Sequence, residues 1–140
     1  MNKDEVELLV AQFEAGTYPA ASWTHTSHVV MGLWYLFHFP VGEACRKIKQ
    51  GIRDYNVSQG GINSETEGYH ETITELYIQT LVRYLSRLEA LEFDEVLSSL
   101  KDEPFMDKAF PFQFYSQKRL MSTEARREWI EPDLQPVSMC

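Results

Sequence analysis

Two histidines three residues apart begin the most apolar stretch of this chain, in the segment 23–28 (WTHTSH). A third histidine follows in the segment 68–72 (GYHET). Side chains at i and i+3 share one side of a helix, so His25 and His28 can bind one metal ion together. The positive end of a helix dipole disfavours imidazolium, so rings near a helix start should stay neutral, the form that binds metal or accepts a proton.

His70 is the predicted third member of this group. At about 100° per residue it falls near the middle of the apolar stripe of a helix predicted over 64–88. If that helix and the one that carries His25 and His28 have their starts at one end, three imidazoles should meet in one cavity. Three histidines with an acid or a water would suit zinc, iron, nickel or manganese.

Acidic and phenolic side chains close to His70 are the candidate catalytic groups. Glu67 or Glu71 would be a further metal ligand or a general base, and Tyr69 or Tyr77 would be a proton donor or a substrate contact. A metal-bound water made acidic would be the reagent for hydrolysis or transfer.

A metal-free interpretation of the same residues stays open. Histidines often cap helices or satisfy buried polar groups, and nearby threonines and tyrosines could supply the hydrogen bonds. The zinc-protease pattern HExxH is not completed, because Thr74 stands where the second histidine is needed. The Glu-x-x-His pair of di-iron bundles occurs once, at Glu67 and His70, where two copies are required. His38 lies at the far end of its helix and is predicted to be structural.

Composition indicates a globular protein that binds neither nucleic acid nor membranes. The 140 residues are 44% hydrophobic and carry a net charge of -8, which disfavours binding to phosphate backbones. The start of the chain lacks the pattern of a signal peptide, and the longest apolar run, 29–37, is too short to span a bilayer. Of the two cysteines, Cys45 is predicted to be a buried thiol and Cys140 exposed, which fits a reducing cytoplasm.

Hydrophobic periodicity predicts an all-α fold, a bundle of four main helices in a single domain, 1–140. The helices are expected at about 4–15, from Ser22 or Thr24 to 39, 41–56 and 64–88, the last beginning with a Ser64–Glu67 capping box. The missing side chain at Gly32 should let a neighbouring helix come close beneath the histidines. Short helices are expected at 94–101 and 122–129, and 105–136 is predicted to be an irregular, aromatic-rich wrap over one end of the core.

The segments WTHTSH and GYHET, with the tail segment 131–134 (EPDL), resemble a family of small uncharacterised bacterial helical proteins with no established activity. The resemblance covers nearly the whole chain and implies a self-contained helical domain. The chain also has a weaker similarity to the DinB-type helical bundles, in which three histidines hold a divalent metal. The order found here, a close histidine pair followed by a single histidine, departs from that family's pattern.

Three functions follow as hypotheses. The first is a small metal-dependent hydrolase or transferase with His25, His28 and His70 as ligands. The second is a metal-free module whose histidines line a pocket for a small acid or an apolar ligand. The third is an interaction protein whose helices form the surface of a homodimer.

Overall fold

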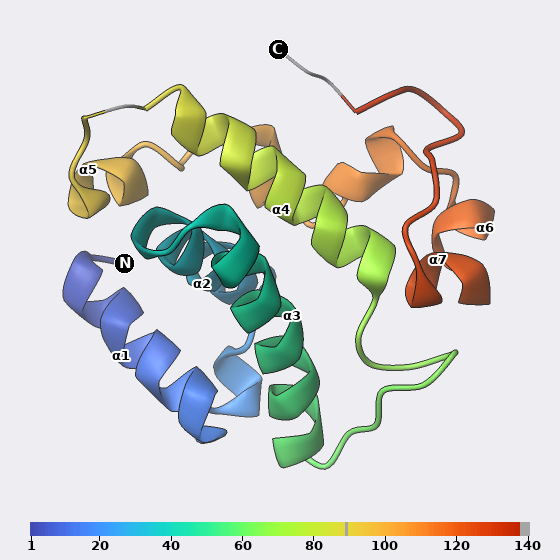
Figure 1. Ribbon diagram of the computed structural model, residues 1–140, viewed down its shortest axis with the longest axis horizontal. Helices are drawn as coiled ribbons and strands as arrows, with labels where there is room; N and C mark the ends of the chain where they lie inside the picture. The colour runs from blue at the N-terminus through green and yellow to red at the C-terminus, as the bar shows by residue number, and fades with distance from the viewer. Residues whose placement is uncertain (89, 138–140) are drawn as a thin grey trace.

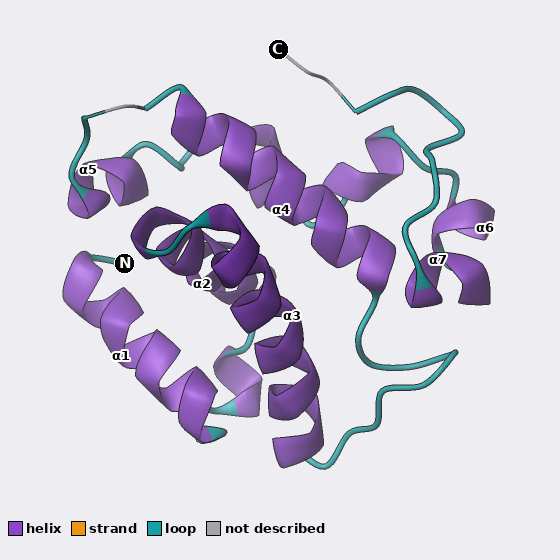
Figure 2. Cartoon of the chain, in the orientation of Figure 1, coloured by secondary structure: helices purple, strands orange, loops and turns teal. Residues whose placement is uncertain are grey.

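The chain folds as an all-α bundle, as predicted from its periodicity. The computed structural model describes residues 1–88 and 90–137, and within these ranges every regular element is helical (Figures 1 and 2). The α-helices are α1 (Lys3–Ala15), α2 (His25–His38), α3 (Val41–Ser58), α4 (Glu71–Ser86), α5 (Phe93–Ser98), α6 (Gln117–Leu120) and α7 (Thr123–Arg127). Short 3-10 helices are η1 (Ala20–Ser22), η2 (Pro104–Met106) and η3 (Phe110–Gln113).

Helix α2 is the central element of the bundle. Thr24 caps it, and its hydroxyl accepts a hydrogen bond from the backbone N–H of Ser27, so the second of the two predicted starts is correct. The helix packs against α1, α3, α4 and α5. A Cβ placed on Gly32 would lie 3.3 Å from a terminal carbon of Leu81, which confirms that a neighbouring helix, α4, comes close at this glycine.

Helices α1 and α3 flank α2 with amphipathic faces. In α1, an Asn2–Glu5 capping box fixes the start, Gly16 in the left-handed conformation ends the helix, and the predicted apolar stripe is buried. Helix α3 extends to Ser58, two residues beyond the predicted end, and packs against α1, α2 and α4. Cys45 of α3 is a half-buried free thiol, whereas Cys140 lies outside the described residues.

The predicted start of the fourth main helix is wrong. Helix α4 begins at Glu71 with His70 as its cap, and the Ser64 hydroxyl caps only a turn by accepting from the N–H groups of Thr66 and Glu67. Gly68 explains the difference. Its φ of 81° is left-handed, and a Cβ there would lie 2.3 Å from the carbonyl oxygen of Ile62, so the backbone leaves the helical conformation before His70.

The predicted C-terminal wrap covers the core, with more local helix than expected. The segment from 105 to 136 contains η3, α6 and α7, and the second predicted short helix, 122–129, is observed as α7 with Ser122 as its cap. The predicted helix at 94–101 is observed as α5. Four aromatic residues of the wrap are buried in the common core: Phe105, Phe110, Phe114 and Tyr115.

The described helices also bear on membrane insertion. None of them combines the length and the apolar character that a membrane-spanning helix needs.

Candidate functional site

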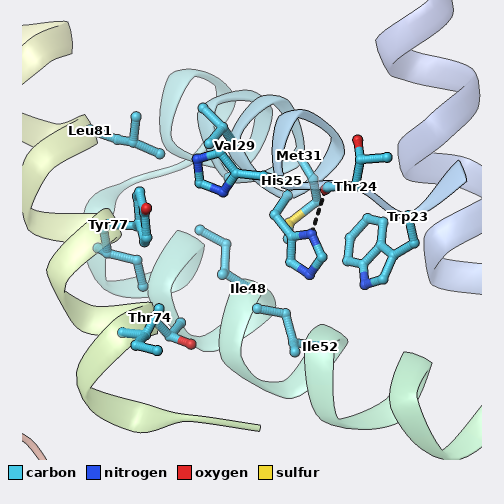
Figure 3. A pocket seen from close by; sticks show the side chains of 14 residues that line it. Trp23, Thr24, His25, Val29, Met31, Ile48, Ile52, Thr74, Tyr77 and Leu81 are labelled. Atoms are coloured by element: carbon cyan, nitrogen blue, oxygen red, sulfur yellow. Dashed lines mark hydrogen bonds between the residues drawn. The ribbon is translucent and has the colours of Figure 1, made fainter. Parts of the chain in front are cut away.

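A pocket opens between α2, α3 and α4, and it contains three of the predicted site residues, His25, His28 and Tyr77 (Figure 3). Its volume is about 230 Å³. The lining is mainly aliphatic, with polar groups contributed by the start of α2 and by α4. The lining residues are Trp23, Thr24, His25, His28, Val29, Met31, Gly32, Ile48, Ile52, Ile73, Thr74, Tyr77, Ile78 and Leu81.

His28 is held at the pocket with one ring nitrogen left available. Its Nδ1 lies 2.7 Å from the carbonyl oxygen of Thr24, the bond drawn as a dashed line in Figure 3. A carbonyl only accepts, so Nδ1 carries the proton and Nε2 of the neutral ring carries a lone pair. The Trp23 ring packs on the imidazole with centroids 3.9 Å apart. Burial lowers the pKa of His28 more than the Thr24 bond raises it, so the ring is neutral at pH 7.

His25 joins the pocket to the C-terminal wrap. Its Nε2 lies 2.9 Å from the carbonyl oxygen of Phe105, so this nitrogen donates and Nδ1 is the acceptor. The ring faces Tyr77 with centroids 5.2 Å apart. Figure 3 shows the two side chains next to each other on one side of the pocket. His25 therefore ties the start of α2 to η2 through Phe105, next to Tyr77 in the α4 wall of the pocket.

The hydroxyl of Tyr77 is a buried polar group that lacks a hydrogen-bond partner among the described residues. Burial raises the pKa of this phenol, and the charge of Asp107 raises it further, so the group is a neutral O–H. A buried hydroxyl without a partner costs about 1–3 kcal/mol. A ligand atom that reached it would recover part of that free energy.

His70 does not join the other two histidines, so the predicted convergence of three imidazoles is wrong for this fold. Its Nδ1 accepts the N–H of Ile73 at 3.1 Å, and its Nε2 donates to the carbonyl oxygen of Leu120 at 2.7 Å. The ring is buried and lies outside the pocket lining. The physical reason is the later start of α4: as a cap, His70 has an extended backbone and folds over the first turn towards α6.

The predicted catalytic groups Glu67, Glu71 and Tyr69 also lie outside the pocket lining. Glu67 is exposed in the loop before α4, where no helix sets it one turn from His70. Glu71 accepts from the Tyr69 hydroxyl at 2.6 Å and from Lys49 Nζ at 2.8 Å. Burial alone would raise the pKa of Glu71, but these hydrogen bonds and the Lys49 charge outweigh it and hold the pKa below its usual value.

Burial also raises the pKa of the Tyr69 phenol, and its bond to the Glu71 carboxylate adds to the effect. Lys49 bonds to Glu75 as well, at 3.2 Å. This ion-pair network joins α3 to α4 away from the pocket, and each of its members is bonded to another member. The network therefore forms a structural contact between the two helices.

The donor set of the described chain does not fit a three-ligand metal centre. Within residues 1–88 and 90–137, no three His, Cys, Asp or Glu side chains are placed to hold one ion. His25 and His28 remain as a pair at the pocket, and His70 uses both ring nitrogens in bonds to the backbone. We therefore derive no reaction step through a metal.

Sequence reasoning missed that α3 contributes to the site. Ile48 and Ile52 belong to the helix predicted over 41–56, which carries no predicted site residue, yet both line the pocket together with Ile73 and Ile78 of α4. Their periodicity signals burial and carries no sign of a cavity, because a packed face and a pocket wall have the same pattern. Thr74 and Tyr77, on the helix predicted to carry His70 as well, line the pocket with His25 and His28, whereas His70 does not.

Comparison of the chain with protein-family models, with curated proteins and with solved structures gave no significant match. The geometry of the site is therefore the basis for a functional proposal.

Proposed function

We propose that this protein is a metal-free binding module for a small ligand with an apolar body and one hydrogen-bond donor. The observation that carries the proposal is the aliphatic pocket of about 230 Å³ with the Nε2 acceptor of His28 in its lining. Ligand pockets typically combine apolar walls with a few fixed polar groups that set orientation. A cavity of about 150 Å³ is enough to bind benzene, so this pocket accommodates a somewhat larger molecule.

The polar groups indicate where the ligand's own polar group would lie. His28 offers an acceptor, since its proton is on Nδ1, and the Tyr77 hydroxyl offers a donor without a partner in the described chain. A ligand group that donates can bind the first, and a group that accepts can bind the second. The hydroxyl of a phenol or a small alcohol can bind to either group, whereas a pure hydrocarbon binds to neither.

The two other hypotheses have less support. A metal-dependent hydrolase or transferase would need the third histidine, which is engaged in capping α4. A homodimer would need a continuous apolar surface, but the large exposed apolar side chains are spread over α1, α2, α3, the loops and the tail. We expect the protein to act in the cytoplasm, and the free thiol of Cys45 supports that compartment.

Isoleucine methyl groups provide a direct test. The chain has six isoleucines, of which Ile48, Ile52, Ile73 and Ile78 line the pocket. Ile62 and Ile130 lie elsewhere and serve as internal controls. Titration of methyl-labelled protein with phenol should shift the four pocket resonances and leave the two controls unchanged. Toluene, of similar shape but without the hydroxyl, should bind roughly fivefold more weakly, because one buried hydrogen bond contributes about 1 kcal/mol.

Two variants make the test specific. Ile52→Phe fills the pocket and should abolish the shifts, whereas Val57→Phe, at an exposed position of the same helix, should leave phenol binding intact. His28→Leu should remove the preference for phenol over toluene. Absence of any pocket-methyl shift with millimolar phenol or toluene would refute the proposal, and a preference that survived in His28→Leu would refute the role of His28.

A further inference from the structure

A second recess lies between α3, the loop 59–70 and α7. Its volume is about 190 Å³, and it is separate from the aliphatic pocket. Figure 1 shows this loop leaving the end of α3 and returning to the start of α4, with α7 beside that start. The recess is lined by Arg53, Asn63, Ser64, Glu65, Tyr69, Arg126 and Arg127.

The charge of the recess is opposite to that of the whole protein. The chain carries a net charge of -8, yet three arginines line this recess and Glu65 is its one acidic member. The lining therefore sums to three positive charges less one negative, or +2. Like charges gathered at one place repel one another, so the arrangement favours a bound anion.

Two of the three guanidinium groups are held in place. The Cζ of Arg53 lies 4.0 Å from the centre of the Tyr69 ring, a cation–π contact. Arg126 donates from Nη1 to the carbonyl oxygen of Gly68 at 2.8 Å. The loop between them is fixed by Asn63, whose side chain accepts from the N–H of Tyr69 and donates to the carbonyl oxygen of Arg53. These donors are therefore ordered before any ligand arrives.

The arginines have few close carboxylate partners within the part of the chain that the structure describes, although the charge of Glu71 acts on Arg53 from a longer distance. Neither Arg53 nor Arg126 has a carboxylate oxygen within 4.0 Å, and Arg127 has only Glu128 at 3.9 Å, both of them well exposed. A guanidinium has five N–H donors in a rigid fork, and Arg126 uses one nitrogen on Gly68. Each of the three groups therefore has N–H donors available for an acceptor in the recess.

We propose that this recess binds a phosphate group. Arginine forks match the oxygens of phosphate, and a lining charge of +2 balances a dianion better than a carboxylate. The recess has the volume of several water molecules, at roughly 30 Å³ each, so it can hold a phosphate with part of its hydration shell. This site does not depend on the proposed function of the aliphatic pocket.

Titration with inorganic phosphate at pH 8 and low salt, followed by calorimetry and by backbone amide shifts, tests the proposal. The wild type should bind, with shifts centred on residues 63–69 and 126–127. Arg127→Gln should weaken binding about tenfold, in line with one charge-assisted bond. Glu65→Gln should strengthen binding severalfold because it removes the one repulsive charge in the lining.

The matched control is Arg46→Gln, which makes the same charge change outside the recess. Arg46 is exposed and lies two turns before Arg53 on α3, so its replacement should leave the phosphate affinity unchanged. Arg127 is suited to the test because its side chain is 62% exposed, so its removal should not alter folding. An Arg46→Gln loss as large as that of Arg127→Gln would show general charge attraction and overturn the site.

Three anions identify the chemical class. Inorganic phosphate and phenyl phosphate should both bind more tightly than acetate at equal ionic strength. Tighter binding of phenyl phosphate supports a phosphate monoester as the ligand, and tighter binding of inorganic phosphate supports the free ion. Acetate binding as tightly as phosphate, or no binding of phosphate by the wild type, would overturn the proposal.

Discussion

Replacement of His70 by alanine should destabilise the protein strongly, for reasons unrelated to metal binding. The imidazole caps α4 through Ile73 and bonds to the carbonyl oxygen of Leu120, both within the buried interior. Loss of a helix cap costs about 1 kcal/mol, and a buried carbonyl left without a donor costs about 1–3 kcal/mol. The free energy of unfolding should therefore fall by about 2–4 kcal/mol in His70→Ala.

Urea denaturation followed by circular dichroism measures this change, with two companion variants. His70→Asn can keep the cap but is too short to reach Leu120, so its loss should be smaller than that of alanine. His38→Ala removes an exposed ring that bonds only to its own helix and should cost less than about 1 kcal/mol. Equal small losses in His70→Ala and His38→Ala would refute the bridging role assigned to His70.

A chelator separates this interpretation from the metal hypothesis. If His70 acts through the two backbone bonds, EDTA should leave the stability of the wild type unchanged. A decrease on EDTA addition that matches the His70→Ala loss would instead show that the residue holds a metal.

Two further predictions concern pH and packing. Burial lowers the pKa of His28 and His70 below 6.5. Below pH 6.5 the unfolded chain therefore binds more protons than the folded chain, and stability should fall as the pH drops. Thermal melts at pH 7 and 5.5 should show this fall, and His70→Asn should make stability less dependent on pH. Gly51→Ala should destabilise the protein by about 1–2 kcal/mol, because its Cβ would lie 2.7 Å from the buried Phe13 ring. Gly42→Ala should not destabilise it, because the nearest atom to that Cβ would be 3.8 Å away. Urea midpoints of both variants provide the test, and an unchanged midpoint in Gly51→Ala would contradict the packing argument.

Local sequence patterns were sufficient to predict most of the helices. Asn2 and Thr24 cap helices by bonds to residues three positions away, and a period of 3.6 in the apolar residues marks the buried faces of α1 and α3. The close approach at Gly32 was also predictable, since a small residue in an apolar helix favours a near neighbour. The caps and the helical period depend on contacts within one element, and the approach at Gly32 depends on the size of one residue.

The failure at 64–70 also has a local cause, although it is harder to recognise. Ser64 and Glu67 have the spacing of a capping box, but a histidine can cap a helix as well, and both candidates precede the same apolar stripe. The choice is made by Gly68, which has a left-handed backbone at a place where any side chain would collide with Ile62 and Asn63. That contact is formed only when the loop folds back on itself.

The sequence by itself determined the all-α class, the apolar character of α2 and the place of a histidine pair at its start, because each follows from periodicity and capping. Only the tertiary structure decided which side chains meet. It directs His70 to Leu120, fifty residues away, and it brings Ile52 of α3 and Tyr77 of α4 to the same pocket as His28. Such contacts depend on how helices pack in space, and a single sequence carries no separate signal for that packing.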